Sequence, residues 1–101
     1  MRLELTEGEL TLQLRHRFAL AEANRVHEAV AALAPLSRLT VDFLDIRESE
    51  DRAFARLAET LLDLRPVDVA LRGLTLRQAH VLDRLLARAG RGGGGAGEAR
   101  S

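Results

Sequence analysis

The 101-residue sequence contains no cysteine, lysine, tryptophan or tyrosine, and only two prolines. Without cysteine the chain can form no disulfide, no thiolate metal site and no cysteine nucleophile, and this absence fits a reducing compartment. No apolar run approaches the roughly 20 residues of a membrane span, and the first residues lack the apolar stretch of a signal peptide. We therefore expect a cytoplasmic protein that does not bind membranes.

Charge of one sign is also lacking, because fifteen arginines balance fifteen acidic residues. A neutral chain attracts phosphate backbones only weakly, so we expect no nucleic-acid partner. The segment 74–87 resembles the first helix of LuxR-type helix-turn-helix domains. A DNA-binding domain of that type needs a second helix for the major groove, and the glycines at 92–95 stand there instead.

What the sequence does contain is enough apolar surface for one small core. Hydrophobic residues make up 47% of the chain and charged residues 30%. The last residues are too rich in glycine to be buried, so we expect one domain over residues 1–90 and a flexible tail over residues 91–101.

The spacing of apolar residues predicts seven elements. Alternating leucines and β-branched residues predict strands over 3–5, 9–16, 38–43 and 67–71. Spacing of three and four predicts helices over 20–34, 49–62 and 76–89. The order ββαβαβα predicts an α/β fold with a single, mostly parallel sheet of about four strands and helices mainly on one face. The expected core consists of Leu12, Leu14, Val26, Leu39, Val41, Phe54, Leu57, Leu61, Val69 and Leu82.

This order, with Leu-Thr-Val-Asp-Phe at 39–43 and Val-Asp-Val-Ala-Leu-Arg-Gly at 67–73, resembles STAS domains, the fold of anti-sigma factor antagonists. In that family a partner kinase phosphorylates a serine that opens the second helix. Aligning Asp42 with the family's strand aspartate puts Glu50 at the motif aspartate and Asp51 at the acceptor serine. The resemblance therefore implies a stand-alone regulatory module that lacks the usual phosphorylatable serine.

No residue pattern indicates catalysis or a cofactor. His16, His27 and His80 lie on different predicted elements, and no two have the spacing that aims both imidazoles at one metal ion. The chain has no glycine-rich phosphate loop and no nucleophile elbow. Ser49, directly before two acidic residues and an apolar helical pattern, is predicted to cap the second helix. We expect no enzyme activity, no metal and no cofactor.

A dense alternation of charge marks the expected turn at 45–51 and the second helix. We expect another protein, such as a regulatory kinase or signalling component, to bind there. The predicted partner-binding residues are Asp45, Glu48, Ser49, Glu50, Asp51, Arg52, Arg56 and Glu59.

Two like charges in this set, Arg52 and Arg56, need compensation at their spacing of four. Glu48 and Glu59 could supply it within the chain, or an acidic patch on a partner could. The alternative function is a structural subunit that uses the fold for assembly of a larger complex. A monomer or weak homodimer favours regulation, and a large homo-oligomer favours the structural subunit.

Overall fold

The structure is a computed structural model that describes residues 1–66 and 68–93, with only the backbone path described for 89–93. The elements follow the expected order: β1 (Arg2–Thr6), β2 (Glu9–Phe18), α1 (Leu20–Leu33), β3 (Arg38–Ser49), α2 (Asp51–Leu64), β4 (Asp68–Arg72) and α3 (Leu76–Gly93). The helix α3 thus continues past the domain end expected at residue 90. Residue 67 and residues 94–101, which hold most of the expected tail, lie outside the described residues.

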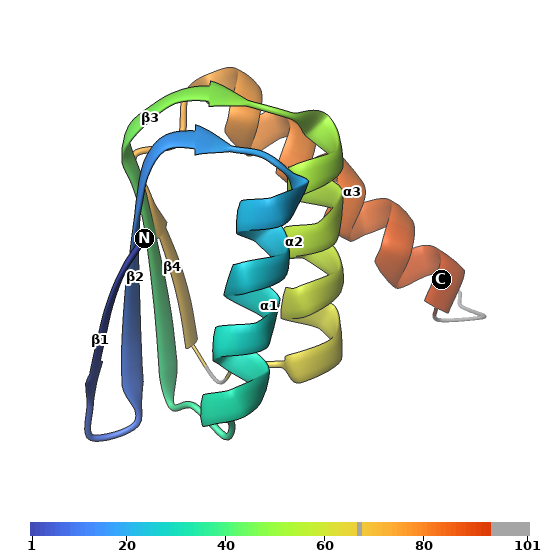
Figure 1. The fold of residues 1–101 in the computed structure, drawn as a ribbon. Coiled ribbons are helices and arrows are strands. Elements are labelled where there is room, and N and C mark those ends of the chain that lie inside the picture. The colour runs from blue at the N-terminus through green and yellow to red at the C-terminus, as the bar shows by residue number, and fades with distance from the viewer. Residues whose placement is uncertain (67, 94–101) are drawn as a thin grey trace.

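The four strands form one sheet in the order β1-β2-β3-β4. This sheet is mixed, and not mostly parallel as expected, because β1 runs antiparallel to β2 while β2–β3 and β3–β4 are parallel. Figure 1 shows α1 and α2 side by side against one face of the sheet, and α3 beside α2. Across the described ranges, no helix combines the length and the hydropathy that crossing a membrane requires.

A tight turn produces the antiparallel pair. Glu7 and Gly8 have φ angles of 52° and 82°, which is the pattern of a two-residue turn matched to the twist of paired strands. The Gly8 carbonyl accepts hydrogen bonds from the backbone N–H of Ser37 (2.9 Å) and from its hydroxyl (3.1 Å). The turn is therefore attached to the segment that leads into β3.

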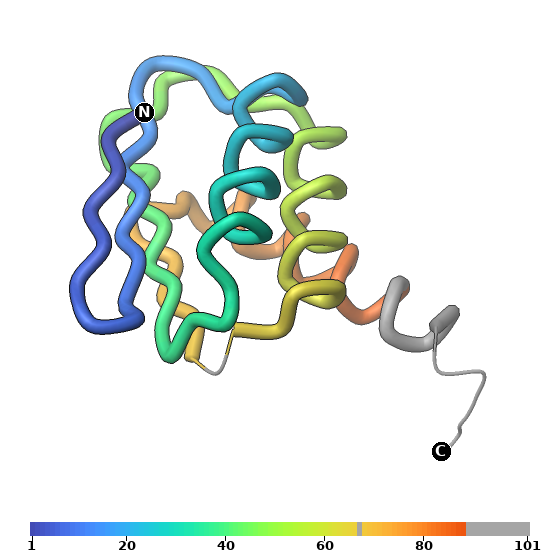
Figure 2. Tube along the Cα trace, turned by 60° about the horizontal axis from the view of Figure 1, so that its bottom comes forward, coloured from blue at the N-terminus to red at the C-terminus, as the bar shows by residue number. Residues whose placement is uncertain are grey.

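The core lies between the sheet and the helices. Its buried apolar residues are Leu10, Leu12, Leu14, Phe18, Ala23, Val26, Val30, Leu36, Leu39, Val41, Phe43, Ala53, Phe54, Leu57, Ala58 and Leu82. Eight of the ten expected core residues are among them. Leu61 is only half-buried, and the expectation for Val69 is wrong, since it is 38% exposed. Val69 is exposed because β4 is the edge strand and α3 lies beside α2, as Figure 2 shows.

All three phenylalanines of the chain meet at one point of this core. The ring of Phe18 lies 5.1 Å from that of Phe43 and 5.0 Å from that of Phe54, both edge to face. Phe43 and Phe54 are stacked at 5.8 Å. The cluster joins the end of β2 and the middle of β3 to the first turn of α2, and such aromatic pairs stabilise beyond the apolar area they bury.

The strands β2 and β3 run further than their hydrophobic patterns predict, to Phe18 and Ser49. Their pairing shifts register twice, between Gln13 and Arg15 and between His16 and Arg17. At each shift β3 has one residue more than β2, which bends and twists the pair. These end segments are mostly polar and exposed, so the core-facing alternation that marks a strand is weak there.

The first bulge is supported from two sides. The buried carboxylate of Asp42 accepts a hydrogen bond from the backbone N–H of Leu44 at 2.9 Å. On the other side lies Gly73, which has a φ of 77°. A Cβ atom at this glycine would lie 2.6 Å from the Leu44 nitrogen and 2.8 Å from its Cα. Only glycine fits there without moving β3.

We expect Phe54→Ala to lower the free energy of unfolding by about 3 to 5 kcal/mol, because it removes a ring from the centre of the aromatic cluster. Leu76→Ala is the control, since this large side chain is 92% exposed, and it should change stability by less than about 0.5 kcal/mol. Urea denaturation measures both. Equal losses would contradict the placement of the cluster in the core.

We expect Gly73→Ala to destabilise the fold more than Gly8→Ala. Both replacements place an alanine at positive φ, which costs roughly 1 to 2 kcal/mol. At Gly8 the nearest atom to the new Cβ is the Ser37 hydroxyl oxygen at 3.3 Å, whereas at Gly73 it is β3 backbone. The overlap should add about 1 to 3 kcal/mol to the Gly73 variant. Urea denaturation showing equal losses would contradict this close approach.

Candidate partner-binding surface

The predicted site residues lie where β2 and β3 extend beyond their neighbours. The strand β1 pairs with β2 only as far as Gln13, and β4 pairs with β3 only as far as Asp42. Beyond these points residues 15–18 and 45–49 form a two-stranded ribbon, which curves over the amino-terminal ends of α1 and α2 in Figure 1. The expected turn at 45–51 is therefore wrong, because the strand continues almost to the helix.

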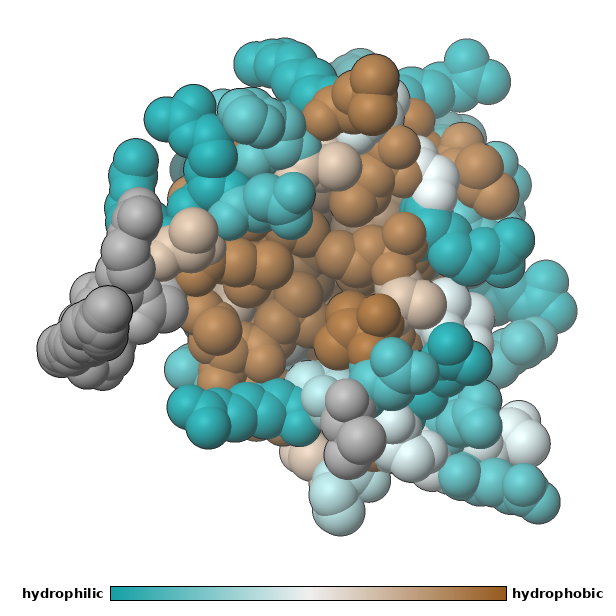
Figure 3. Space-filling model, turned by 180° about the vertical axis from the view of Figure 1, so that it is seen from behind, coloured by the Kyte–Doolittle hydropathy of each residue, from teal (hydrophilic) through white to brown (hydrophobic). Residues whose placement is uncertain are grey.

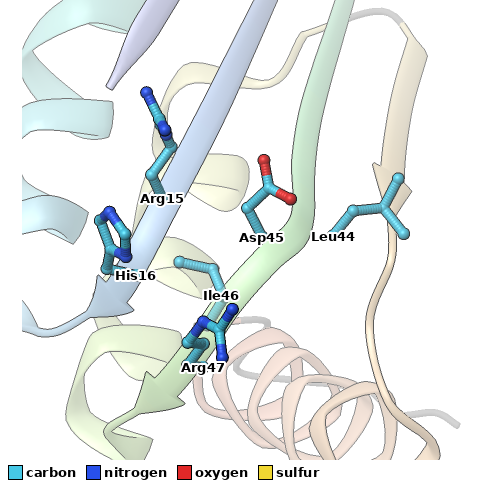
Figure 4. Close-up of a pocket in the computed structure, with 6 residues that line it drawn as sticks. All are labelled: Arg15, His16, Leu44, Asp45, Ile46 and Arg47. Carbon is cyan, nitrogen blue, oxygen red and sulfur yellow. The ribbon is translucent and has the colours of Figure 1, made fainter.

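Asp45 lies in a surface pocket of about 300 Å³ on this ribbon. The pocket is lined by Arg15, His16, Leu44, Asp45, Ile46 and Arg47. In Figure 4, Arg15 and His16 come from β2 and the other four residues from β3, with Leu44 pointing away from Asp45 toward β4. The Asp45 carboxylate lies 3.5 Å from the Gln13 amide nitrogen that donates to it. The other five lining residues were not predicted, because register shifts bring them together.

Ser49 does not cap α2, which corrects the sequence-based expectation. It is the last residue of β3 and pairs with Phe18. Its hydroxyl accepts a hydrogen bond of 3.2 Å from the amide of Gln78. The capping position belongs to Glu50, which makes no side-chain capping bond and whose backbone N–H donates to the Phe18 carbonyl at 3.0 Å. The extension of β2 keeps Ser49 in the strand.

Gln78 belongs to a capping box at the start of α3. Its backbone N–H donates to the Thr75 hydroxyl at 3.1 Å, and its side-chain oxygen accepts from the Thr75 N–H at 2.9 Å. The sequence signal is a threonine followed three residues later by glutamine. The box fixes the amino-terminal end of α3 beside Ser49 and Asp51. A cavity of about 100 Å³ lies there between α2 and α3.

Glu50 and Arg52 form an ion pair on the surface. The Arg52 Nε donates to the Glu50 carboxylate at 3.0 Å. This hydrogen bond, together with the charge of Arg52, lowers the pKa of Glu50 below its usual value. Of the compensations that the sequence left open for Arg52, the structure shows one within the chain, from Glu50 in place of Glu48.

Arg56 is held within the protein. Its Nε donates to the Asn24 side-chain oxygen on α1 at 2.9 Å, and its guanidinium pairs with Glu59 at 3.1 Å, which is one of the two alternatives that the sequence left open. A second hydrogen bond between α1 and α2 lies nearby and joins His27 to Thr60. The buried Thr60 hydroxyl uses its own proton to donate to the Arg56 carbonyl at 3.1 Å. The Nδ1 of His27 must therefore carry the proton in its 2.9 Å bond to Thr60. The two like charges on α2 thus have compensation inside the chain.

The eight predicted residues lie between the second half of β3 and the third turn of α2. Glu50 and Arg56 are half-buried, and the others are exposed: Asp45, Glu48, Ser49, Asp51, Arg52 and Glu59. This surface carries acidic groups up to Asp51 and both signs along α2, so it can set partner specificity by complementarity. Across residues 1–66 and 68–93, no group of three or more histidine, aspartate or glutamate side chains is placed to hold a metal ion.

The fold and the contacts described above are the basis for a proposal about function. No protein-family model matches the chain, and no curated protein matches it either.

Proposed function

We propose that the protein is a non-catalytic regulatory module that binds another protein, and that it resembles an anti-sigma factor antagonist of the STAS type. Its partner binds at the end of β3 and the first turns of α2, through the residues Asp45, Glu48, Ser49, Glu50, Asp51, Arg52, Arg56 and Glu59. The order ββαβαβα supports the STAS resemblance. The carboxylate of Asp51 stands where that family has its acceptor serine.

One observation carries the proposal: a rigid scaffold presents exposed charges of both signs at one end of the molecule. The aromatic cluster holds the ribbon, and the Arg56 bond to Asn24 holds α2 against α1. The backbone that carries the exposed side chains therefore needs little ordering when a partner binds, which lowers the entropic cost of association. A partner with complementary acidic and basic groups would fit this surface.

A structural subunit is the second candidate function. The observation that favours it is the edge of β4, which no strand of the described chain covers. Light scattering separates the two functions, because a large homo-oligomer supports assembly whereas a monomer or a small closed oligomer supports regulation.

We expect exchange of two exposed charges, Glu48→Arg with Arg52→Glu, to reduce capture of the native partner at least about tenfold. The exchange leaves the net charge at zero but inverts the pattern that a partner reads. Arg56 is left intact, because it also bonds α1. Quantitative mass spectrometry of proteins retained by the tagged chain measures the change.

The matched control is the same exchange on α1, Arg25→Glu with Glu28→Arg, since both side chains are exposed and lie outside the proposed surface. This control should retain the partner at the wild-type yield. Both variants should keep the wild-type melting temperature, because exposed charges contribute little to stability. Equal capture by the two folded variants would remove the end of β3 and α2 as the binding surface.

A further inference from the structure

The strand β4 has a free edge. It pairs with β3 on one side, and on the other side no strand within residues 1–66 and 68–93 pairs with it. Edge strands present unpaired backbone donors and acceptors, and proteins commonly block them by keeping them short, with charged side chains, with proline or with a covering helix. The described strand is Asp68-Val-Ala-Leu-Arg72, with no proline and with charges of opposite sign at its two ends.

The backbone of β4 shows which groups point outward. The N–H of Asp68 donates to the Ser37 carbonyl at 3.1 Å, so this residue faces the preceding strand. Because backbone groups alternate in direction along a strand, Ala70 and Arg72 also face β3. The N–H and C=O groups of Val69 and Leu71 consequently point to the free edge.

Two copies of this edge match each other in the antiparallel orientation. If a two-fold axis passes beside Ala70, Val69 of each copy lies opposite Leu71 of the other copy, which gives two such pairs. Opposed residues of this kind exchange both N–H···O bonds. The four resulting hydrogen bonds use every outward backbone group of Val69 and Leu71 in both copies.

The same register pairs the charges. Asp68 lies opposite Arg72 of the second copy, and Arg72 opposite Asp68 of the second copy. Within each copy Asp68 already pairs with Arg38 at 3.2 Å, and Arg72 lies opposite Asp42. Positive and negative side chains would therefore alternate from strand to strand across the joined sheet. Opposite charges that face each other across strands are stabilising.

The other edge of the sheet does not match itself in this way. Pairing two β1 strands over their full length, Arg2–Thr6, puts Glu4 opposite Glu4 of the second copy. Like charges directly opposed are destabilising. The self-complementary edge is β4.

Apolar surface lies beside the free edge. The view from behind, in which β4 and α3 face the reader, shows a broad apolar area in the middle of the molecule (Figure 3). The partly buried apolar residues that α2, β4, α3 and the loop before α3 contribute to the core are Leu61, Leu64, Leu71, Leu74, Val81, Leu85 and Leu86. Val69 adds a side chain that is 38% exposed. Contiguous apolar surface of this kind marks interaction sites.

We propose that the occupant of this edge is a second copy of the chain. Two β4 strands pair antiparallel about a two-fold axis at Ala70, which joins the two sheets into one of eight strands with both sets of helices on one side. The contact is isologous, so it closes at two copies and builds no filament. It adds a dimer interface to the partner-binding surface and does not depend on it.

The test uses two variants that cannot pair with themselves. Position 68 of one copy lies opposite position 72 of the other. In a dimer of the Asp68→Arg variant both of these residues are arginine, and in a dimer of the Arg72→Asp variant both are aspartate. Sedimentation velocity should give the wild type a mass near twice 11.1 kDa, and each variant alone should dissociate at least about tenfold more readily. An equimolar mixture restores both opposite-charge pairs, so it should form a heterodimer with nearly the wild-type dissociation constant.

Circular dichroism confirms that each variant is folded before mixing. Val69→Pro serves as an independent variant, because it removes one outward N–H and leaves the bonds to β3 intact, and it should be monomeric. A monomeric wild type would overturn the proposal. So would variants that remain dimeric, or folded charge variants whose mixture stays monomeric.

Discussion

The contact among Phe18, Phe43 and Phe54 is the interaction on which the rest of the structure depends. Each ring comes from a different element, and together they are the only large aromatic side chains in the chain. Without this contact the polar ends of β2 and β3 would have little apolar area to hold them over the helices. The cluster anchors the ribbon, and the ribbon in turn determines where α2 begins and which charges lie at its first turn.

The bulges determine the local shape of that surface. A regular pairing would alternate residues on the two faces of the ribbon, but each extra residue in β3 reverses the faces that follow it. Asp42 stabilises the first bulge from within the strand, and Gly73 allows the chain that leaves β4 to pass close to it. In the STAS resemblance Asp42 is the strand aspartate. Its contact in this chain is a backbone N–H, which is a sufficient structural reason for a carboxylate there.

Composition and periodicity predicted the number, type and order of the elements, because each long helix and central strand carries its own apolar pattern. The same patterns failed where polar residues continue a strand. Ser49 precedes two acidic residues, which is typical of a helix cap, yet pairing with Phe18 keeps it extended. Val69 alternates like a core residue, but burial depends on which element lies above it, and that is a tertiary property. Register shifts between distant segments were equally beyond a local pattern, so the pocket at Asp45 was not predicted.

The two proposed surfaces differ in the kind of binding they support. The end of β3 and α2 is charged and exposed, which suits a reversible and specific contact whose rate depends on ionic strength. The edge of β4 combines backbone hydrogen bonds with apolar area, which suits a longer-lived contact between identical copies. Antiparallel pairing about Ala70 would direct the two ribbons toward opposite ends of the joined sheet. A single small partner therefore could not contact both charged surfaces, and each copy in the dimer would bind its own partner molecule.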